Sequence, residues 1–337
     1  MKAVILDAPR KLRVTDVPIP EIPPDDVLIR VKASSLCGTD VNIYSGLFEW
    51  PLPTRLGHEY SGEVAAVGNR VSDFEVGDRV VGENLIGCGH CDECKAGRYN
   101  LCERTPQLFD THAEYTVAPA RSLYKVAKGV EWDVAALVEP LAVAYNALER
   151  ADLQAGGAVA ILGDGGIGLS ALLMARVKGA GKAIVTGLKP HKLSLADRLG
   201  ADATINADRT DIAQAVLDET GGRGADSTIV AAGWPTMVRD AMKLTRRGGS
   251  ICVLGLYHGR EPATLEPMDF ILREQTIRGN FASPNVWSAV IRLVERGLVD
   301  PKPLITHRFP LENAEEAFKT ALDDRKKPVK IVLNPNM

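Results

Sequence analysis

The feature that most constrains the fold is a glycine-rich segment, Gly163-Asp164-Gly165-Gly166-Ile167-Gly168, which follows an apolar run and opens a helical stretch. In such a turn the first glycine permits the tight bend, the second lets the backbone approach a pyrophosphate, and the third lets helix and strand pack closely. The N-terminus of the helix then favours anionic phosphates. The segment, Gly166 and Ile167 included, predicts a dinucleotide-binding turn; a glycine-rich turn without a ligand is the simpler alternative.

The sequence around this segment alternates between strand-like and helical stretches. Apolar runs at residues 158–162 and 183–185, and further strand-like segments at 227–230 and 250–254, are separated by helical stretches, the first of them at residues 167–178. Continuous apolar runs are typical of parallel strands buried on both faces, and their alternation with helices indicates βαβ units. We therefore predict an α/β fold with a doubly wound parallel sheet.

The first part of the chain, roughly 145 residues long, has a different pattern of short strands and turns. Val/Ile-rich strands at residues 27–31, 63–67 and 79–81 are separated by Gly, Pro and Asp turns, which predicts a compact β-domain. From about residue 283 the tail carries two amphipathic helices, at 286–296 and 313–322, and a final strand at 329–333. Because 337 residues exceed one typical core, two domains are expected.

Charge and hydropathy exclude several classes of protein. The chain has 40 Lys and Arg residues against 43 Asp and Glu, a net charge of −3, which predicts neither a nucleic-acid partner nor an anionic membrane surface. No apolar run approaches the ~18 residues of a membrane span, and the N-terminus reads as a short strand instead of a signal peptide. Clustered thiols without a secretion signal favour metal over disulfides, and hence a reducing cytoplasm.

The segment after the second apolar run bears on the choice of nicotinamide cofactor. NAD-binding proteins usually end that strand with an acidic residue, which accepts a hydrogen bond from the ribose 2′-hydroxyl. Residues 186–192 contain no carboxylate here: Gly187 leaves space, and Lys189, His191 and Lys192 could face a 2′-phosphate. This pattern favours NADP over NAD, the alternative being that these are solvated charges in a loop.

Four cysteines, Cys88, Cys91, Cys94 and Cys102, form one tight cluster. Four thiolates at this spacing can close a tetrahedron around zinc and leave no open coordination position. An iron–sulfur cluster and a zinc ribbon that binds nucleic acid are the alternatives. Neither fits well, because the domain is not basic and no redox partner domain is evident, so we predict a zinc ion that folds a surface loop or supports a subunit contact.

A second group of metal-ligating residues is more dispersed. Cys37 follows a strand, and His58 and Glu59 precede another. A thiolate, an imidazole and a carboxylate, from Glu59 or Glu139, suit a zinc site that stays open to a substrate. Asp40 is a natural hydrogen-bond partner for the second nitrogen of His58. The simpler alternatives are a buried structural Cys37 and a helix-capping Glu139.

Together these motifs resemble the zinc-dependent medium-chain dehydrogenases. The segment from Gly57-His58-Glu59 through Gly62, Gly68 and Val71 is similar to the zinc signature of that family, and the cysteine cluster to its structural zinc lobe. The resemblance spans essentially the whole chain. It implies a GroES-like β-barrel catalytic domain at residues 1–147, with the lobe at 85–104, a Rossmann domain at 148–282, and a return to the catalytic domain at 283–337.

The resemblance also implies roles for single residues. Cys37, His58 and Glu59 would ligate the catalytic zinc together with water, and Glu139 would either ligate it or hold the water. Thr39 would take part in proton release, although Asn42 stands where relatives often have His. Lys330 would contact the cofactor pyrophosphate, the alternative being a solvated strand-edge lysine. Family members are homodimers or homotetramers, so the same is expected here.

Glu139 narrows the expected substrate. Alcohol-type members of the family place a third Cys there, whereas polyol and threonine dehydrogenases carry Glu-Pro. We therefore predict a zinc-dependent NAD(P) oxidoreductase, with two zinc ions per chain, that transfers hydride between a secondary alcohol, a polyol or sugar alcohol, and the cofactor. An L-threonine 3-dehydrogenase, a zinc-free quinone or enone reductase and a non-catalytic nucleotide binder are the alternatives. Phe48, Trp50 and Phe281 are candidate lining residues of the substrate site.

Overall fold

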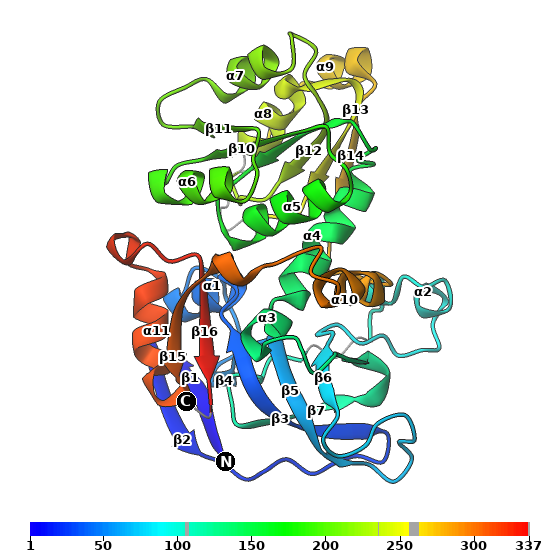
Figure 1. Ribbon diagram of the computed structural model, residues 1–337, viewed down its shortest axis with the longest axis vertical. Coiled ribbons are helices and arrows are strands. Elements are labelled where there is room, and N and C mark those ends of the chain that lie inside the picture. Colours follow the sequence, from blue (N-terminus) through cyan, green and yellow to red (C-terminus); the bar gives the residue numbers. More distant parts are fainter. Residues whose placement is uncertain (105–107, 235, 256–262, 336–337) are drawn as a thin grey trace. The chain divides into compact units, whose positions relative to one another are not determined.

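A computed structural model describes residues 1–104, 108–234, 236–255 and 263–335. The chain divides into two compact units: unit 1 comprises Met1–Glu139 and Pro284–Met337, and unit 2 comprises Pro140–Ser283 (Figure 1). The first boundary falls within α4 (Val138–Arg150), and the domain boundary expected from the sequence, residue 147, lies near the end of that helix. Among the described helices, none is long and apolar enough to cross a membrane.

Unit 2 is built on a six-stranded sheet with the order β11-β10-β9-β12-β13-β14. Every strand pairs in parallel with its neighbours, which confirms the predicted doubly wound sheet. The strands are β9 (Ala158–Leu162), β10 (Lys182–Gly187), β11 (Ala203–Asn206), β12 (Ala225–Val230), β13 (Thr245–Val253) and β14 (Thr276–Gly279).

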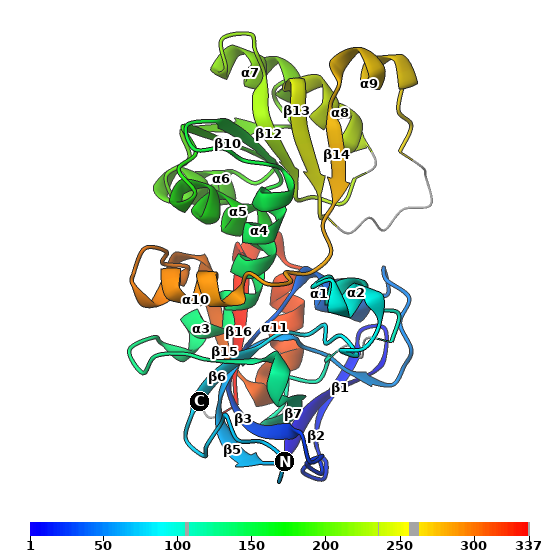
Figure 2. The same cartoon turned by 90° about the vertical axis from the view of Figure 1, so that its right-hand side faces the viewer.

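The helices of unit 2 cover both faces of this sheet. Besides most of α4, the helices of the unit are α5 (Gly166–Val177), α6 (Pro190–Arg198), α7 (Ile212–Glu219), α8 (Thr236–Leu244) and α9 (Pro267–Arg273). Helices α5 and α6 lie on one side, and α7, α8 and α9 lie on the other (Figure 2). The strand order reverses at β9, because β10 continues to one side of it and β12 lies on the other. Ligands of such sheets bind at the carboxyl ends of the strands at this reversal, which is where the glycine turn lies.

The described residues of unit 1 form two sheets. The smaller has the order β2-β1-β4, and the larger runs β15-β16-β3-β5-β6-β8, with β7 pairing to β3. The strands are β1 (Lys2–Ala8), β2 (Lys11–Asp16), β3 (Asp26–Ser35), β4 (Thr54–Arg55), β5 (Glu59–Val67), β6 (Arg79–Gly82), β7 (Tyr115–Pro119), β8 (Leu123–Lys125), β15 (Ile305–Pro310) and β16 (Lys330–Asn334). All pairs are antiparallel except β15 with β16.

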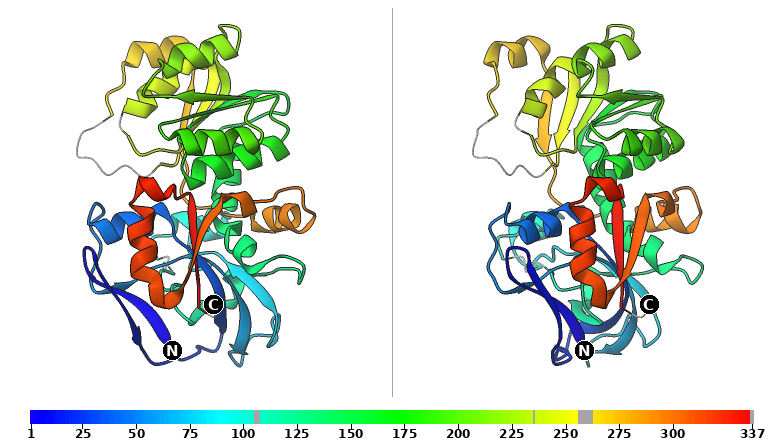
Figure 3. Two further views of the ribbon diagram at one scale, coloured as in Figure 1. Left: turned by 60° about the vertical axis from the view of Figure 1, so that its left-hand side comes forward. Right: turned by 90° about the vertical axis from the view of Figure 1, so that its left-hand side faces the viewer.

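The C-terminal segment completes unit 1. Strand β16 pairs with β3 through Val332 and Leu333, and α11 (Ala314–Ala321) lies beside β15 and β16 (Figure 3). One core cluster joins apolar side chains of β1, α1 (Gly38–Ser45), α11 and β16, so the tail is part of this core. The other helices of the unit are α2 (Asp92–Lys95), α3 (Trp132–Ala136), α10 (Trp287–Glu295) and the 3₁₀ turns Tyr99–Leu101, Ala120–Ser122, Lys302–Leu304, Leu311–Asn313 and Asp324–Lys326.

Candidate functional site

The ends of two paired strands bring the dispersed metal-ligating residues together. Cys37 follows β3 as the N-cap of α1, and Glu59 opens β5 opposite Ser35 of β3. One ligand atom each of Cys37, His58 and Glu59 lies within 4.8 Å of the others. Cys37 is half-buried, and His58 and Glu59 are buried. A thiol, an imidazole and a carboxylate at this separation are a donor set that suits zinc.

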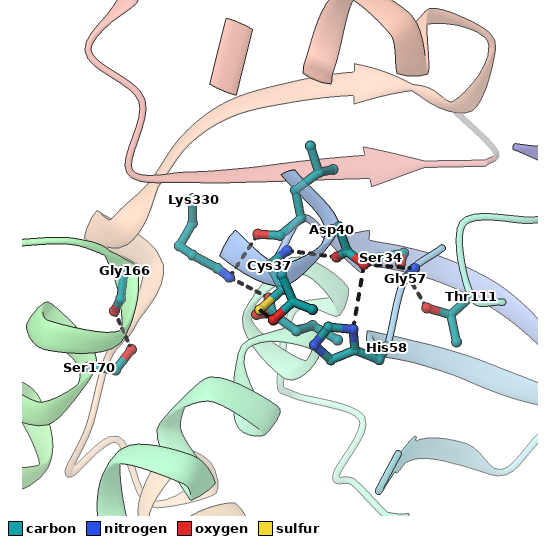
Figure 4. A network of polar contacts seen from close by, with 12 residues as sticks. Ser34, Cys37, Asp40, Gly57, His58, Thr111, Gly166, Ser170 and Lys330 are labelled. Atoms are coloured by element: carbon teal, nitrogen blue, oxygen red, sulfur yellow. Dashed lines mark hydrogen bonds and ion pairs between the residues drawn. The ribbon is translucent and has the colours of Figure 1, made fainter. Parts of the chain in front are cut away.

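Asp40 fixes the backbone on both sides of this group (Figure 4). Its fully buried carboxylate accepts hydrogen bonds from Cys37 N at 2.9 Å and Gly57 N at 3.2 Å. Its Oδ1 lies 3.6 Å from His58 Nδ1, longer than a hydrogen bond. Burial opposes ionisation, yet the neighbouring His58 and His112 rings hold the pKa of Asp40 well below its usual range. Asp40 therefore faces His58, but the hydrogen bond to the second ring nitrogen that the sequence predicted is not formed at this separation, and an orienting role remains a prediction.

His112 belongs to this network, and sequence reasoning did not identify it. Its fully buried Nε2 lies 3.7 Å from Asp40 Oδ2, and its Nδ1 shares a hydrogen bond of 2.8 Å with Ser34 Oγ. Ser34 Oγ in turn lies 3.0 Å from Thr111 Oγ1. No local pattern marks His112, because its partners are distant in sequence. Asp40 thus lies between two imidazole rings.

Lys330 and Glu139 also lie in the interior of unit 1. Lys330 is 5% exposed, and its Nζ donates hydrogen bonds to Leu36 O at 3.0 Å and to Glu59 Oε2. The alternative of a solvated edge lysine is therefore wrong. Glu139 is buried in the first turn of α4, and burial raises its pKa to about 7. Glu139 is not part of the compact group of Cys37, His58 and Glu59.

Aromatic side chains of unit 1 approach the same group. The centroid of the Phe109 ring lies 4.8 Å from that of His58 and 5.2 Å from that of Trp50. The ring centroids of Trp50 and Phe48 are 6.0 Å apart. The sequence singled out Phe48 and Trp50 but not Phe109, which follows no regular pattern. Phe281, the third predicted lining residue, belongs to unit 2 and is 52% exposed. Thr39 Oγ1 lies 3.7 Å from Cys37 Sγ.

The four-cysteine cluster forms a separate lobe of unit 1. The sulfur atoms of Cys88, Cys91, Cys94 and Cys102 all lie within 4.8 Å of one another. Backbone N–H groups point at the sulfurs: Cys91 N lies 3.4 Å from Cys88 Sγ, and Cys88 N lies 3.4 Å from Cys102 Sγ. Four convergent sulfurs with N–H donors to them fit a closed structural zinc site.

In unit 2 the glycine turn has the shape that a dinucleotide requires. Gly165 caps α5, and a Cβ there would have open space around it, so an anion can reach the backbone. A Cβ on Gly168 would lie 2.0 Å from Gly163 O, so only glycine lets helix and strand pack this closely. Gly166 and Ile167 form the first turn of α5, where Gly166 O accepts a hydrogen bond from Ser170 Oγ. These residues fit a pyrophosphate at the helix N-terminus.

The turn also brings a carboxylate to a place where the sequence indicated none. Asp164 Oδ2 accepts hydrogen bonds from the backbone N–H groups of Leu188 at 2.9 Å and Lys189 at 2.8 Å. Lys189 is the N-cap of α6, and Lys192 lies in its first turn. The sequence did not indicate this role, because Asp164 lies in the glycine-rich turn after β9. Its contact with the end of β10 arises from the parallel pairing of β9 and β10.

Comparison with known proteins agrees with this geometry. Residues 23–128 match the family model for the alcohol dehydrogenase GroES-like domain, and residues 166–296 match that for zinc-binding dehydrogenases. A sorbitol dehydrogenase from Bacillus subtilis (strain 168) is 36% identical over 346 residues, covering 100% of this chain and 98% of that protein. An L-threonine 3-dehydrogenase from Symbiobacterium thermophilum is 37% identical over 98% of this chain and 97% of its own length.

A solved structure extends the likeness to three dimensions. A protein described as a zinc-binding dehydrogenase from Sinorhizobium meliloti 1021, bound to NADP, has a TM-score of 0.93 at 32% identity and covers 99% of both chains. The chain therefore belongs to the zinc-dependent medium-chain dehydrogenase/reductase family. It is an enzyme, a zinc-dependent oxidoreductase that uses a nicotinamide cofactor, as the sequence predicted.

Proposed function

We propose that the chain oxidises a secondary alcohol of a polyol or sugar alcohol to a ketone and reduces NAD or NADP, and catalyses the reverse reaction. The observation that carries this proposal is the convergence of Cys37, His58 and Glu59 within 4.8 Å, with Glu139 buried in the same unit. The site has one thiol, and Glu139 stands where alcohol-type members of the family have another Cys. This pattern is the reason why the sequence predicts the polyol and threonine branch. The similarity to a sorbitol dehydrogenase supports a polyol as the substrate.

In this proposal Cys37, His58 and Glu59 hold the catalytic zinc, and Glu139 either joins them or holds water. When bound, zinc supplies Lewis-acid chemistry that lowers the pKa of a substrate hydroxyl, and the nicotinamide supplies the hydride acceptor. Asp40 holds the two backbone segments that carry Cys37 and His58, through its bonds to Cys37 N and Gly57 N. The Phe109 ring packs at an angle of 57° against the His58 ring, where it would limit the access of water.

Lys330 sets the charge beside the site. Burial disfavours its cation, but the pairing with Glu59 raises its pKa, so it remains charged. Glu59 is thus shared between Lys330 and the metal position, and the ammonium offsets part of the negative charge of the carboxylates. Contact of Lys330 with the cofactor pyrophosphate remains a prediction. Asn42 does not titrate, so we propose that the alcohol proton leaves by way of Glu139 and water, with Thr39 near the reacting oxygen.

The second zinc is proposed for Cys88, Cys91, Cys94 and Cys102, with a structural role. In unit 2, Gly163, Gly165, Gly166, Ile167 and Gly168 would hold the pyrophosphate, and Gly187, Lys189 and Lys192 would border the adenosine ribose. The NADP preference predicted from these last three residues remains a prediction, and Asp164 gives an argument for the opposite preference. A chain with this many thiols suits a reducing cytoplasm, and the position of β14 at the edge of the parallel sheet suits a homodimer or homotetramer.

L-threonine 3-dehydrogenase is the second candidate, because several relatives carry that name at similar identity. The chemistry is the same, but an amino-acid substrate needs groups that bind its carboxylate and its ammonium. The two candidates separate in one assay. Formation of reduced nicotinamide is measured with sorbitol and other polyols, simple secondary alcohols and threonine, each with NAD and with NADP.

The proposal predicts turnover on a polyol, loss of that turnover when a chelator removes zinc, and recovery when zinc is restored. Turnover on threonine alone would replace the polyol by the second candidate. Full turnover in protein shown by elemental analysis to lack zinc would contradict the mechanism. Zinc-loaded protein that is inactive with every pair of substrate and cofactor would contradict the proposed substrate classes.

A further inference from the structure

Strand β10 ends at Gly187, which has no side chain. A Cβ built on Gly187 would lie 2.4 Å from Cβ, Cγ and Oδ2 of Asp164. The side chain of Asp164 therefore fills the space that a side chain at position 187 would take. In NAD-binding proteins an acidic residue at the end of this strand accepts the ribose 2′-hydroxyl. Here a carboxylate reaches that place from the first glycine turn.

The same carboxylate occupies the donors that an anion would need. Asp164 Oδ2 accepts from Leu188 N and Lys189 N, the last two N–H groups before α6 begins at Pro190. A 2′-phosphate at this helix start would have to compete for these donors and would lie beside a negative charge. Asp164 is only partly buried, and a carboxylate has about four lone-pair sites. It can therefore still accept a hydrogen bond from a ribose hydroxyl.

We propose that Asp164 is the residue that selects the cofactor, and that it makes the chain prefer NAD to NADP. Its carboxylate accepts the 2′-hydroxyl of NAD, and it excludes the 2′-phosphate of NADP by charge and by its hold on the Leu188 and Lys189 amides. This inference rests on the nicotinamide cofactor of the proposed function. It reverses the preference expected from Gly187, Lys189 and Lys192, because those three residues were considered without the carboxylate that lies against them.

The test is a binding measurement without substrate. Isothermal titration calorimetry gives the dissociation constants of NAD and NADP for the wild-type chain, for Asp164→Asn and for Asp197→Asn. Asp164→Asn keeps the size and one acceptor oxygen but removes the charge. Asp197→Asn is the matched control, since it removes the same charge from an exposed position on α6.

The wild-type chain is expected to bind NAD at least about tenfold more tightly than NADP, because a carboxylate beside a phosphate is strongly unfavourable. Asp164→Asn should lower this ratio by about tenfold or more, whereas Asp197→Asn should leave it unchanged. A wild-type chain that binds NADP as tightly as NAD would overturn the inference whether or not the variant folds. So would a ratio that is the same in Asp164→Asn and in wild type.

Failure of this inference differs from failure of the proposed function. If no alcohol is oxidised but the affinity ratio depends on Asp164, the substrate proposal fails and the cofactor assignment stands. If polyols are oxidised equally well with both cofactors and the ratio is near one, the inference fails alone.

Discussion

At the scale of single residues, the site contains buried charged groups, each of which has polar partners. Asp40 is buried without any exposed surface, yet two amides donate to it and two imidazole rings face it. Buried carboxylates are costly unless such partners satisfy them. The partners here include the backbone beside two of the proposed zinc ligands, so we propose that Asp40 is a positioning residue for Cys37 and His58.

Asp40→Asn is expected to weaken zinc binding at the catalytic position by about 10- to 100-fold, as is typical when the partner of a metal-bound histidine is removed. A chromophoric chelator that competes for zinc measures this affinity. The four-cysteine site serves as the internal control, since its zinc should be retained. An unchanged affinity for both zinc ions would show that Asp40 does not support the ligands.

Glu83 predicts a dependence of stability on pH that is separate from catalysis. It is 6% exposed, and burial raises its pKa from 4.5 to about 7, although the hydroxyl groups of Tyr99 and Tyr124 donate to it. The folded state therefore favours the neutral acid, and this contribution is lost as the pH rises through about 7. Between pH 6 and 8.5 the free energy of unfolding should fall by roughly 1–2 kcal/mol from this group.

Urea titrations of wild type and Glu83→Gln at several pH values in this range check the prediction. The variant should show a smaller fall, because glutamine does not titrate. Equal falls in the two proteins would mean that Glu83 is already ionised in the folded state at pH 6.

At the scale of elements, one turn beside the site is tightly packed. The turn before β5 bends at Gly57, whose φ is +96°, and a Cβ there would lie 2.5 Å from the buried His112 ring. Gly57→Ala should therefore destabilise the fold by about 2–4 kcal/mol, the sum of a backbone cost and a steric cost.

Gly77 is the matched control for that substitution. Its φ is +95°, but a Cβ there would meet nothing within 4 Å. Gly77→Ala should cost only about 1 kcal/mol, which is the backbone cost alone. Denaturant unfolding of both variants gives the difference. Equal losses of stability would contradict tight packing of Gly57 against His112.

The four-cysteine lobe is an element that metal should hold in place. Cys94→Ser is expected to lower the zinc content from two ions per chain to one and to reduce thermal stability, because structural zinc contributes directly to folding. Elemental analysis and thermal unfolding measure the two effects. Loss of both zinc ions, or of neither, would contradict two independent sites.

At the scale of the whole molecule, the features that could be predicted from the sequence are those with a periodic pattern or a local motif. The apolar runs and the glycine turn predicted the doubly wound sheet, and β16 at Lys330–Asn334 lies within one residue of the expected strand. The convergence of Cys37 with His58 and Glu59 was predictable because ligand chemistry marks each residue. Asp164 against Gly187, and His112 against Asp40, were not predictable. Each contact joins segments distant in sequence, and it becomes visible only in the folded chain.

The most direct test of the account compares Cys37→Ala with Cys252→Ala. Cys252 is a buried free thiol in β13, in the other unit, and has no proposed role. Zinc content and polyol-dependent formation of reduced nicotinamide are measured on both variants. Cys37→Ala should lose one zinc per chain and nearly all turnover, while Cys252→Ala keeps both. Full turnover in Cys37→Ala would contradict a catalytic zinc held by Cys37, His58 and Glu59.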